Sequence, residues 1–309
     1  MNDYSVLILG VACAGIGGEL FVRGAVGLAS WARISPLIIG VTVAAFATSS
    51  PELSVAINAA MAGKPQITLG DALGSNVVNI ALILASALII SGVQSSRDSV
   101  KRDFSVALII PIITGILCLD GELSRFDGFL MLGMFLAWLA VVIREARRQR
   151  SAAAKVPGSQ SGWRAVLLCS AGLAALAAAG NFIVSGARGV ALSFGIDEFV
   201  IGATVVAIGT SMPELATTLI AKYRGHDEVG LGTILGSNIY NGIFIIAVAA
   251  IISPITVVWR EVSTALVFGL GALVLAYPSR EGFIGRRRGV MLLTLYAAYL
   301  TLIFKHQAT

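Results

Sequence analysis

Two glutamates lie inside long apolar stretches, where a charged residue is rarely tolerated. Glu52 belongs to the run 35–61 and Glu214 to the run 198–221, and neither run contains a lysine or an arginine. An ionised side chain at the centre of a bilayer costs at least about 2.5–3.5 kcal/mol on insertion scales. Two facing carboxylates also repel each other unless a cation lies between them or one is protonated. A buried acid–base pair is the alternative, but the runs supply no base, so the glutamates indicate a cation site.

Residues that carry oxygen surround each glutamate at matching spacings. A threonine four residues earlier shares a helix face with the glutamate, and a serine follows that threonine. The residues are Thr48, Ser49 and Glu52 in one run, and Thr210, Ser211 and Glu214 in the other. Pro51 and Pro213 lack a backbone N–H, so they release carbonyls around Ala47 and Gly209. A bound ion would satisfy these carbonyls; a simple kink, with a hydroxyl or water as the partner, is the alternative.

The neighbouring apolar runs add hydroxyl and amide groups. Ser75 and Asn79 are four residues apart, as are Ser237 and Asn241. Any one asparagine could instead form a hydrogen bond between helices. Together the two sets make an all-oxygen group without sulfur or imidazole, which suits hard cations such as Ca²⁺ or Na⁺.

The chain repeats itself at a constant offset of 162 residues. GVTVAAFATSSPEL at 40–53 matches GATVVAIGTSMPEL at 202–215 at nine of 14 positions. LGDALGSNVVN at 69–79 matches LGTILGSNIYN at 231–241 at seven of 11 positions without a gap. If each half crosses the membrane an odd number of times, the second half enters from the opposite side and the copies are inverted. Secondary transporters are built this way, with the substrate site at the repeat interface.

The composition requires a membrane environment for these runs. Of the 309 residues, 57% are apolar and only 13% are charged, about half the share in a soluble domain, and the mean hydropathy is +0.88. These values exclude a soluble enzyme, a disordered chain and a nucleic-acid binder, despite a pI near 9.3. Ten runs are long enough for a membrane helix. They are 4–31, 35–61, 68–92, 104–120, 125–144, 164–192, 198–221, 230–252, 260–278 and 288–305.

The predicted fold is an all-α polytopic membrane protein with two inverted five-helix repeats. The first repeat is 1–144, the second is 164–309, and the polar segment 145–163 links them. With both termini outside, 16 of the 22 basic residues fall in inside loops, four fall outside and two lie within runs. The positive-inside rule therefore places both termini outside and the linker in the cytoplasm. We expect a multi-pass protein of the inner or plasma membrane. Glu19 and Arg23 are spaced for an ion pair within one helix.

The doubled pattern of T-S-x-P-E followed by G-S-N-x-x-N resembles the sodium/calcium exchanger family, in its compact prokaryotic form, over nearly the whole chain. The resemblance implies an antiporter that exchanges Ca²⁺ for Na⁺ by alternating access, with the first and sixth spans sliding past the others. Glu52 and Glu214 would bind both ions, and Thr48 and Thr210 would help to bind Ca²⁺. The flanking Na⁺ sites would use Ser49, Ser75, Ser211, Ser237 and the carbonyls near Ala45 and Ala207. Asn79 and Asn241 would face the central cavity.

One departure from the family leaves the coupling open. Relatives often carry an acid at the position of Asn241, so the two glutamates give this site a formal charge of −2. A proton-coupled or potassium-dependent exchanger of the same fold is the first alternative, and a cation channel is the second. We expect no enzymatic activity, no cofactor, no nucleic-acid ligand and no obligatory protein partner. Apart from the bilayer, the expected ligands are the transported ions.

Overall fold

The computed structural model describes residues 3–63, 65–95, 100–152, 162–193, 207–257 and 259–307. Within these ranges the chain is mostly helical, and the strands are only two residues long. The first half contains α1 (Asp3–Ala32), α2 (Pro36–Ile39), η1 (Gly40–Ala44), α3 (Ala45–Thr48), α4 (Ser50–Met61), α5 (Gln66–Val77), η2 (Val78–Leu84), α6 (Ala85–Ile90), β1 (Val93–Gln94), η3 (Val100–Phe104), α8 (Ser105–Leu117), β2 (Glu122–Leu123) and α9 (Arg125–Ala152). The second contains α10 (Gly162–Ser193), α12 (Ala207–Thr210), α13 (Met212–Tyr223), α14 (Asp227–Ile239), η5 (Tyr240–Ile245), α15 (Ile246–Ile252), β3 (Ile255–Thr256), α16 (Trp259–Ala276), β4 (Phe283–Ile284) and α17 (Arg286–Gln307). The η segments are π-helical.

Each predicted apolar run overlaps helical residues. By length and composition, five helical segments of the described chain could cross a membrane. They are Ile8–Ala32, Gln66–Ile90, Arg125–Gln149, Gly162–Ala179 and Asp227–Ile252. A sixth candidate joins Pro36–Thr48 to Ser50–Met61 across a one-residue break.

The helix α9 continues to Ala152, eight residues into the segment predicted to be a linker. Its last turns read EARRQRSA, a sequence of good helix formers. Gln149 Nε2 also donates a hydrogen bond to Glu145 Oε1 at 3.2 Å, one turn earlier. The remaining predicted linker, 153–161, lies outside the described residues.

The chain divides into two compact units, and each takes in segments from both halves of the sequence. Unit 1 comprises 1–49 and 137–236, and unit 2 comprises 50–136 and 237–309. The predicted repeats are therefore combined within each unit, so a residue of one repeat can contact the other repeat inside a single unit.

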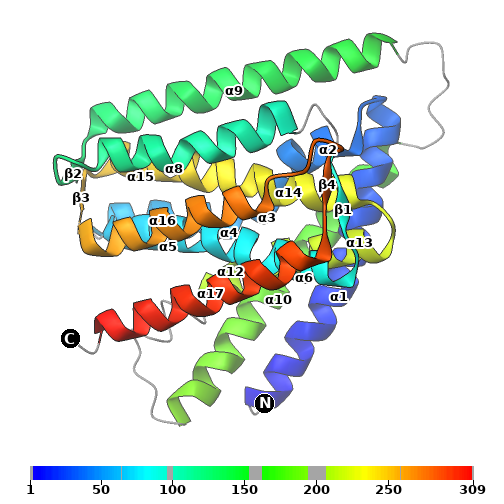
Figure 1. Ribbon diagram of the computed structural model, residues 1–309. Helices are drawn as coiled ribbons and strands as arrows, with labels where there is room; N and C mark the ends of the chain where they lie inside the picture. The colour runs from blue at the N-terminus through cyan, green and yellow to red at the C-terminus, as the bar shows by residue number, and fades with distance from the viewer. Residues whose placement is uncertain are drawn as a thin grey trace. The chain divides into compact units, whose positions relative to one another are not determined.

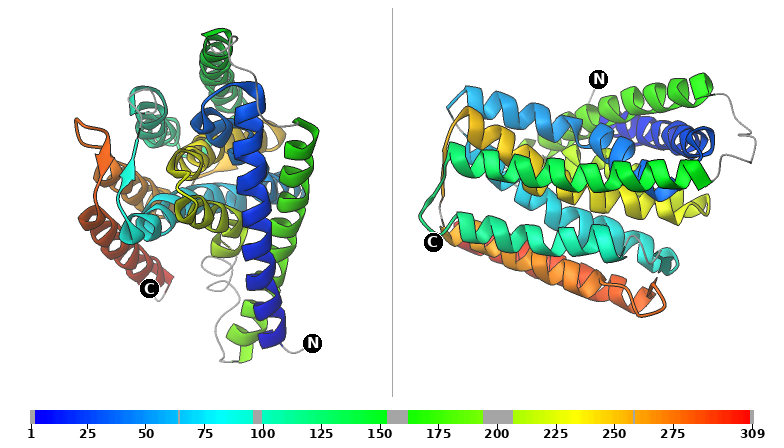
Figure 2. Two further views of the ribbon diagram at one scale, coloured as in Figure 1. Left: turned by 90° about the vertical axis from the view of Figure 1, so that its right-hand side faces the viewer. Right: turned by 90° about the horizontal axis from the view of Figure 1, so that it is seen from above.

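In unit 1, α1 and α10 run side by side (Figures 1 and 2). Glycines allow their backbones to approach closely, because a Cβ on Gly172 would lie 2.5 Å from the amide nitrogen of Phe21. A Cβ on Gly24 would likewise lie 2.5 Å from the nitrogen of Cys169. The apolar core beside this contact includes the buried residues Phe21, Val22, Ala25, Leu176 and Ala221.

In unit 2, two short antiparallel strand pairs each join one half of the chain to the other. Val93 of β1 pairs with Ile284 of β4, and Leu123 of β2 pairs with Ile255 of β3. Figure 1 labels both pairs. The strand β3 follows β1 by 162 residues and β4 follows β2 by 161, so the two pairs are equivalent under the repeat.

Candidate cation site

Both glutamate-bearing helices begin after the same one-residue break. Ser49 separates α3 from α4 with φ −87° and ψ 11°, and Ser211 separates α12 from α13 with φ −84° and ψ 8°. Pro51 and Pro213 follow two residues later, in the first turn, where a helix loses nothing through a missing N–H. The matching angles show that the sequence repeat extends to the local backbone.

In unit 1, a hydroxyl from one half of the chain contacts the carboxylate from the other half. Ser49 Oγ donates a hydrogen bond to Glu214 Oε1 at 3.1 Å. The side chains are buried, with 3% exposure for Ser49 and 1% for Glu214. Thr48 and Ser211 are also buried beside these helices, at 0% and 1%. We call Thr48, Ser49, Thr210, Ser211 and Glu214 the unit 1 polar cluster.

The carbonyl predicted at Ala45 already has partners within its own helix. It accepts the amide N–H of Ser49 at 2.9 Å and the hydroxyl of Thr48 at 3.3 Å. A carbonyl oxygen has two lone pairs, so both acceptor positions are used in this structure. Ala207, its counterpart, is the first residue of α12.

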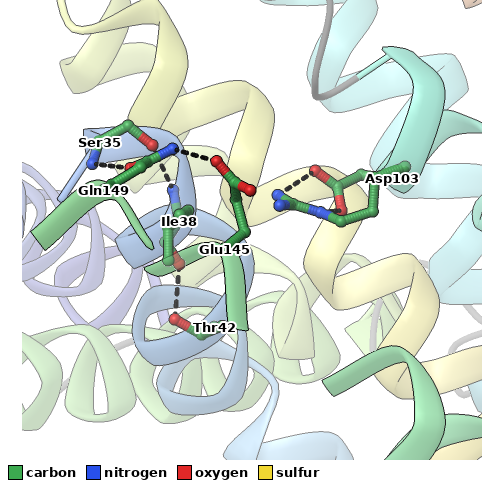
Figure 3. A network of polar contacts seen from close by, with 7 residues as sticks. Ser35, Ile38, Thr42, Asp103, Glu145 and Gln149 are labelled. Atoms are coloured by element: carbon green, nitrogen blue, oxygen red, sulfur yellow. Dashed lines mark hydrogen bonds and ion pairs between the residues drawn. The ribbon is translucent and has the colours of Figure 1, made fainter. Parts of the chain in front are cut away.

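A hydrogen-bond network fixes the start of the helix that leads to Thr48 and Ser49 (Figure 3). The N-cap residue of α2, Ser35, accepts the amide of Ile38 through Oγ at 3.4 Å. Its own amide donates to Gln149 Oε1 of α9 at 2.9 Å. Thr42 Oγ1 in turn donates to the carbonyl of Ile38 at 2.5 Å. The C-terminal part of α9 thus holds the start of the helical segment that leads to Thr48 and Ser49.

In unit 2, Glu52 stands in the first turn of α4, which packs against α5 and η5. Its side chain is 1% exposed. The other predicted residues of this unit come from α5, η2, α14 and η5 and are equally buried. They are Ser75 and Ser237, both 0% exposed, and Asn79 and Asn241, both 1% exposed. We call these five residues the unit 2 polar cluster.

The two asparagines of this cluster lie in π-helical turns. Asn79 belongs to η2 and Asn241 to η5, which occupy equivalent positions in the repeat. Such turns displace backbone partners by one residue and occur often at functional sites. The spacing argument assumed regular helices, so it did not anticipate them.

Two further asparagines, which the spacing argument passed over, join the two halves of the chain by hydrogen bonds. Asn76 Nδ2 donates to the carbonyl of Asn238 at 3.2 Å, and Asn238 Nδ2 donates to the carbonyl of Asn76 at 3.2 Å. The residues are 162 apart, so they occupy equivalent positions in the two copies of the sequence repeat. Asn79 Nδ2 also donates to Asn238 Oδ1 at 3.1 Å. The signal was available, since both belong to the repeated G-S-N motif.

Several buried polar atoms of the clusters have no hydrogen-bond partner in the described structure. They are Ser75 Oγ, Asn79 Oδ1, Ser211 Oγ, and both Oδ1 and Nδ2 of Asn241. Each such group costs about 1–3 kcal/mol when it is buried and left unsatisfied. Oxygen atoms kept free at this cost can act as ligands for a hard cation.

A site that holds a resident metal through histidine, cysteine and carboxylates would look different. Among the described residues, no three His, Cys, Asp or Glu side chains gather closely enough to hold a metal ion. The clusters consist of hydroxyls, amides and two carboxylates, a donor set suited to Ca²⁺ or Na⁺ as cargo.

Comparison with known proteins agrees with the cation site inferred from these residues. The chain is 32% identical to the putative antiporter CaxA of Alkalimonas amylolytica over 93% of each protein. It is 31% identical to the inner membrane protein YrbG of Escherichia coli, over 97% of this chain and 96% of the relative. The solved structure of the sodium-calcium exchanger NCX_Mj, soaked with Na⁺ and Sr²⁺, matches with a TM-score of 0.84, 29% identity and 97% coverage of both chains.

The model of the family described as sodium/calcium exchanger protein matches residues 3–144 and 164–305. The matched segments cover nearly all of the two predicted repeats and omit the predicted linker, 145–163. The resemblance inferred from the doubled motif is thereby confirmed, and the chain is a multi-pass membrane protein of the transporter class. It belongs to the sodium/calcium exchanger protein family.

Proposed function

We propose that the protein is a secondary antiporter that exchanges Ca²⁺ for Na⁺ across the membrane by alternating access. The observation that carries this proposal is the set of buried oxygen atoms without partners in the two polar clusters. Each cluster also contains one buried glutamate, Glu214 in unit 1 and Glu52 in unit 2. Membership of the exchanger family supports the assignment of Ca²⁺ and Na⁺ as cargo.

The proposed architecture has ten transmembrane helices in two inverted repeats, with the cations held by residues of both. The equivalent breaks at Ser49 and Ser211 and the reciprocal bonds of Asn76 and Asn238 support the repeat. Both termini would lie outside and residues 145–163 in the cytoplasm, since the basic residues concentrate in the loops on that side. The inner-membrane relative supports the same location.

The proposed ligands follow the sequence prediction. Glu52 and Glu214 would bind both cargo ions, while the threonines 48 and 210 would help to bind Ca²⁺. Flanking Na⁺ ions would be held by the serines 49, 75, 211 and 237 and by the carbonyls near residues 45 and 207. The Ala45 carbonyl would have to exchange a present hydrogen bond for the ion.

Competition between the ions would drive the exchange. Two carboxylates give a formal charge of −2, which one Ca²⁺ or two Na⁺ neutralise. A full set of either ion leaves no room for the other, so each displaces the other. Moving an occupied, neutralised site costs less than moving bare buried charges across a bilayer, so loaded states change access more readily than a half-empty one.

Sodium-driven uptake of ⁴⁵Ca²⁺ into proteoliposomes tests this function. We expect uptake that requires an outward Na⁺ gradient and that falls by at least about 100-fold in E52Q and E214Q, because a buried charge partner contributes roughly 3–5 kcal/mol. E122Q is a matched control, since Glu122 is an exposed carboxylate in β2. Normal uptake by E52Q, or no uptake by the wild type, would contradict the proposal.

The same vesicles separate the coupling ions. Uptake driven by a pH gradient without Na⁺ would show proton coupling, and an added requirement for K⁺ would show a potassium-dependent exchanger. Flux without any counter-ion, accompanied by unitary currents, would show a channel. We expect Na⁺ alone to support exchange.

A further inference from the structure

The four asparagines of the doubled G-S-N-x-x-N motif are not used symmetrically. Asn79 Nδ2 donates to Asn238 Oδ1 at 3.1 Å. Adding 162 to the first residue and subtracting it from the second gives the equivalent bond, from Asn241 Nδ2 to Asn76 Oδ1. That bond is absent: both of these atoms are buried and have no partner in the described structure. One of two equivalent hydrogen bonds is therefore formed and the other is open.

The two side chains that would form the open bond, Asn76 and Asn241, belong to neighbouring segments. A Cβ on Gly242, the residue after Asn241, would lie 3.3 Å from Asn76 Nδ2, so the Asn76 amide adjoins this turn. The reciprocal backbone bonds of Asn76 and Asn238 also hold the two turns together. Because both copies have the same residue types in the same register, either copy can form the side-chain bond.

A second pair in unit 1 shows the same imbalance. The hydroxyl of Ser49 is bound to Glu214, whereas the hydroxyl of Ser211, its equivalent, is buried without a partner among the described residues. An unsatisfied buried group is costly, so a bond that is open in one state is expected to close in another. In two inverted copies, an exchange of local conformations between the copies also exchanges the membrane sides.

We propose that Asn76 and Asn238 are positioning residues that act alternately. In the state described here Asn238 holds the amide of Asn79, and in the state open to the opposite side Asn76 holds the amide of Asn241. This proposal rests on the proposed function, because it assigns the switch to the access change of the same cation site.

The switch decides which asparagine is prepared to bind a cation. When the Nδ2 of Asn79 is engaged, its Oδ1 is the atom left to accept, and this oxygen has no partner in the structure. An amide fixed in this way presents oxygen and withholds its donor. The amide of Asn241, with neither atom bonded, has no such fixed orientation.

The variants N76A and N238A form a matched pair. Each variant removes one of the two side-chain-to-carbonyl hydrogen bonds between Asn76 and Asn238. Because both variants lose one such bond, this loss does not contribute to the difference between them. N238A in addition removes the acceptor that is used in the present state, and N76A removes the acceptor that is used in the opposite state. Because one buried hydrogen bond corresponds to roughly a fivefold change in an equilibrium, the ratio of the two access states should shift about fivefold in opposite directions.

Hydrogen–deuterium exchange of the full-length protein in nanodiscs reads this ratio without requiring transport. We expect segments that gain protection in N76A to lose it in N238A, and the double variant N76A/N238A to return to the wild-type pattern. In proteoliposomes of sided orientation, the half-saturating Ca²⁺ concentration should rise on one face in N238A and on the other face in N76A.

Parallel changes in the two single variants, or effects that add in the double variant, would overturn the switch and indicate a purely structural role. If an alanine variant does not fold, N76S and N238S give the same comparison. A wild type without Na⁺/Ca²⁺ exchange would refute the proposed function, while the exchange patterns of the variants would still decide for or against the switch.

Discussion

The substitutions S49A and S211A should separate two hydroxyls that the repeat makes equivalent. Ser49 Oγ donates a hydrogen bond to Glu214 Oε1 at 3.1 Å, and both side chains are almost fully buried. Hydrogen bonds to charged groups contribute about 1.5–3 kcal/mol. A distance of 3.1 Å exceeds the roughly 2.5–2.7 Å of the strongest hydroxyl–carboxylate bonds. We therefore expect S49A to cost about 1.5 kcal/mol.

Removal of the Ser211 hydroxyl should leave the free energy of unfolding of the cation-free protein unchanged or raise it. Its Oγ is buried and has no hydrogen-bond partner among the described residues. The substitution to alanine removes an unsatisfied polar group, which is neutral or slightly stabilising. The free energy of unfolding should thus fall in S49A and stay constant or rise in S211A.

Thermal unfolding of the purified protein, with and without Ca²⁺ or Na⁺, measures both effects. A loss of 1.5 kcal/mol corresponds to a fall of roughly 2–3 °C in Tm for a chain of 309 residues. Saturating cation raises the stability by about 2.7 kcal/mol at 100 times Kd. If both hydroxyls bind cargo, both variants should reduce this cation-dependent rise. Equal falls in Tm for the two variants without cations would refute the reasoning.

Further substitutions test the packing, the surface charges and the charge of the site. G172L should prevent correct packing of α1 on α10, because a Cβ at this position would lie 2.5 Å from the backbone nitrogen of Phe21. G133L is the control and should fold normally, because a Cβ at Gly133 has open space. Size-exclusion chromatography reports the difference. Glu19 forms partly exposed ion pairs with Arg23, as its spacing predicts, and with Arg224, whose Nε lies 3.0 Å from Glu19 Oε2. E19Q removes both and should cost less than about 1 kcal/mol in thermal unfolding. D227N should cost more, about 3 kcal/mol, because Lys222 is only 6% exposed and loses an acceptor at 2.8 Å; equal losses in E19Q and D227N would contradict this ranking. N241D adds a second carboxylate to the unit 2 polar cluster, which otherwise contains only Glu52. It should therefore increase the number of Na⁺ ions exchanged per Ca²⁺, measured from the reversal potential of vesicle uptake; an unchanged ratio would show that this position does not set the coupling.

The sequence alone was enough to predict a membrane protein, to find the repeat and to single out Glu52 and Glu214 as candidate cation ligands. Carboxylates in apolar runs are conspicuous, because the cost of burying charge removes them wherever they have no role. A constant offset of 162 residues needs only a comparison of the chain with itself. The doubled motif was specific enough to identify the family, which the family match confirms. The side of the membrane that each terminus faces remains a prediction from the basic residues.

Only the tertiary structure decided which of these residues meet. Spacing along one helix predicts a shared face, but contacts between helices depend on packing, which the linear sequence does not encode locally. The bond from Ser49 to Glu214, the reciprocal bonds of Asn76 and Asn238, and the π-helical turns around Asn79 and Asn241 are of this kind. Identical motifs predict symmetric roles, whereas the folded chain forms the bond from Asn79 to Asn238 and leaves the equivalent bond from Asn241 to Asn76 open, a difference that only the three-dimensional packing of the two motifs can produce.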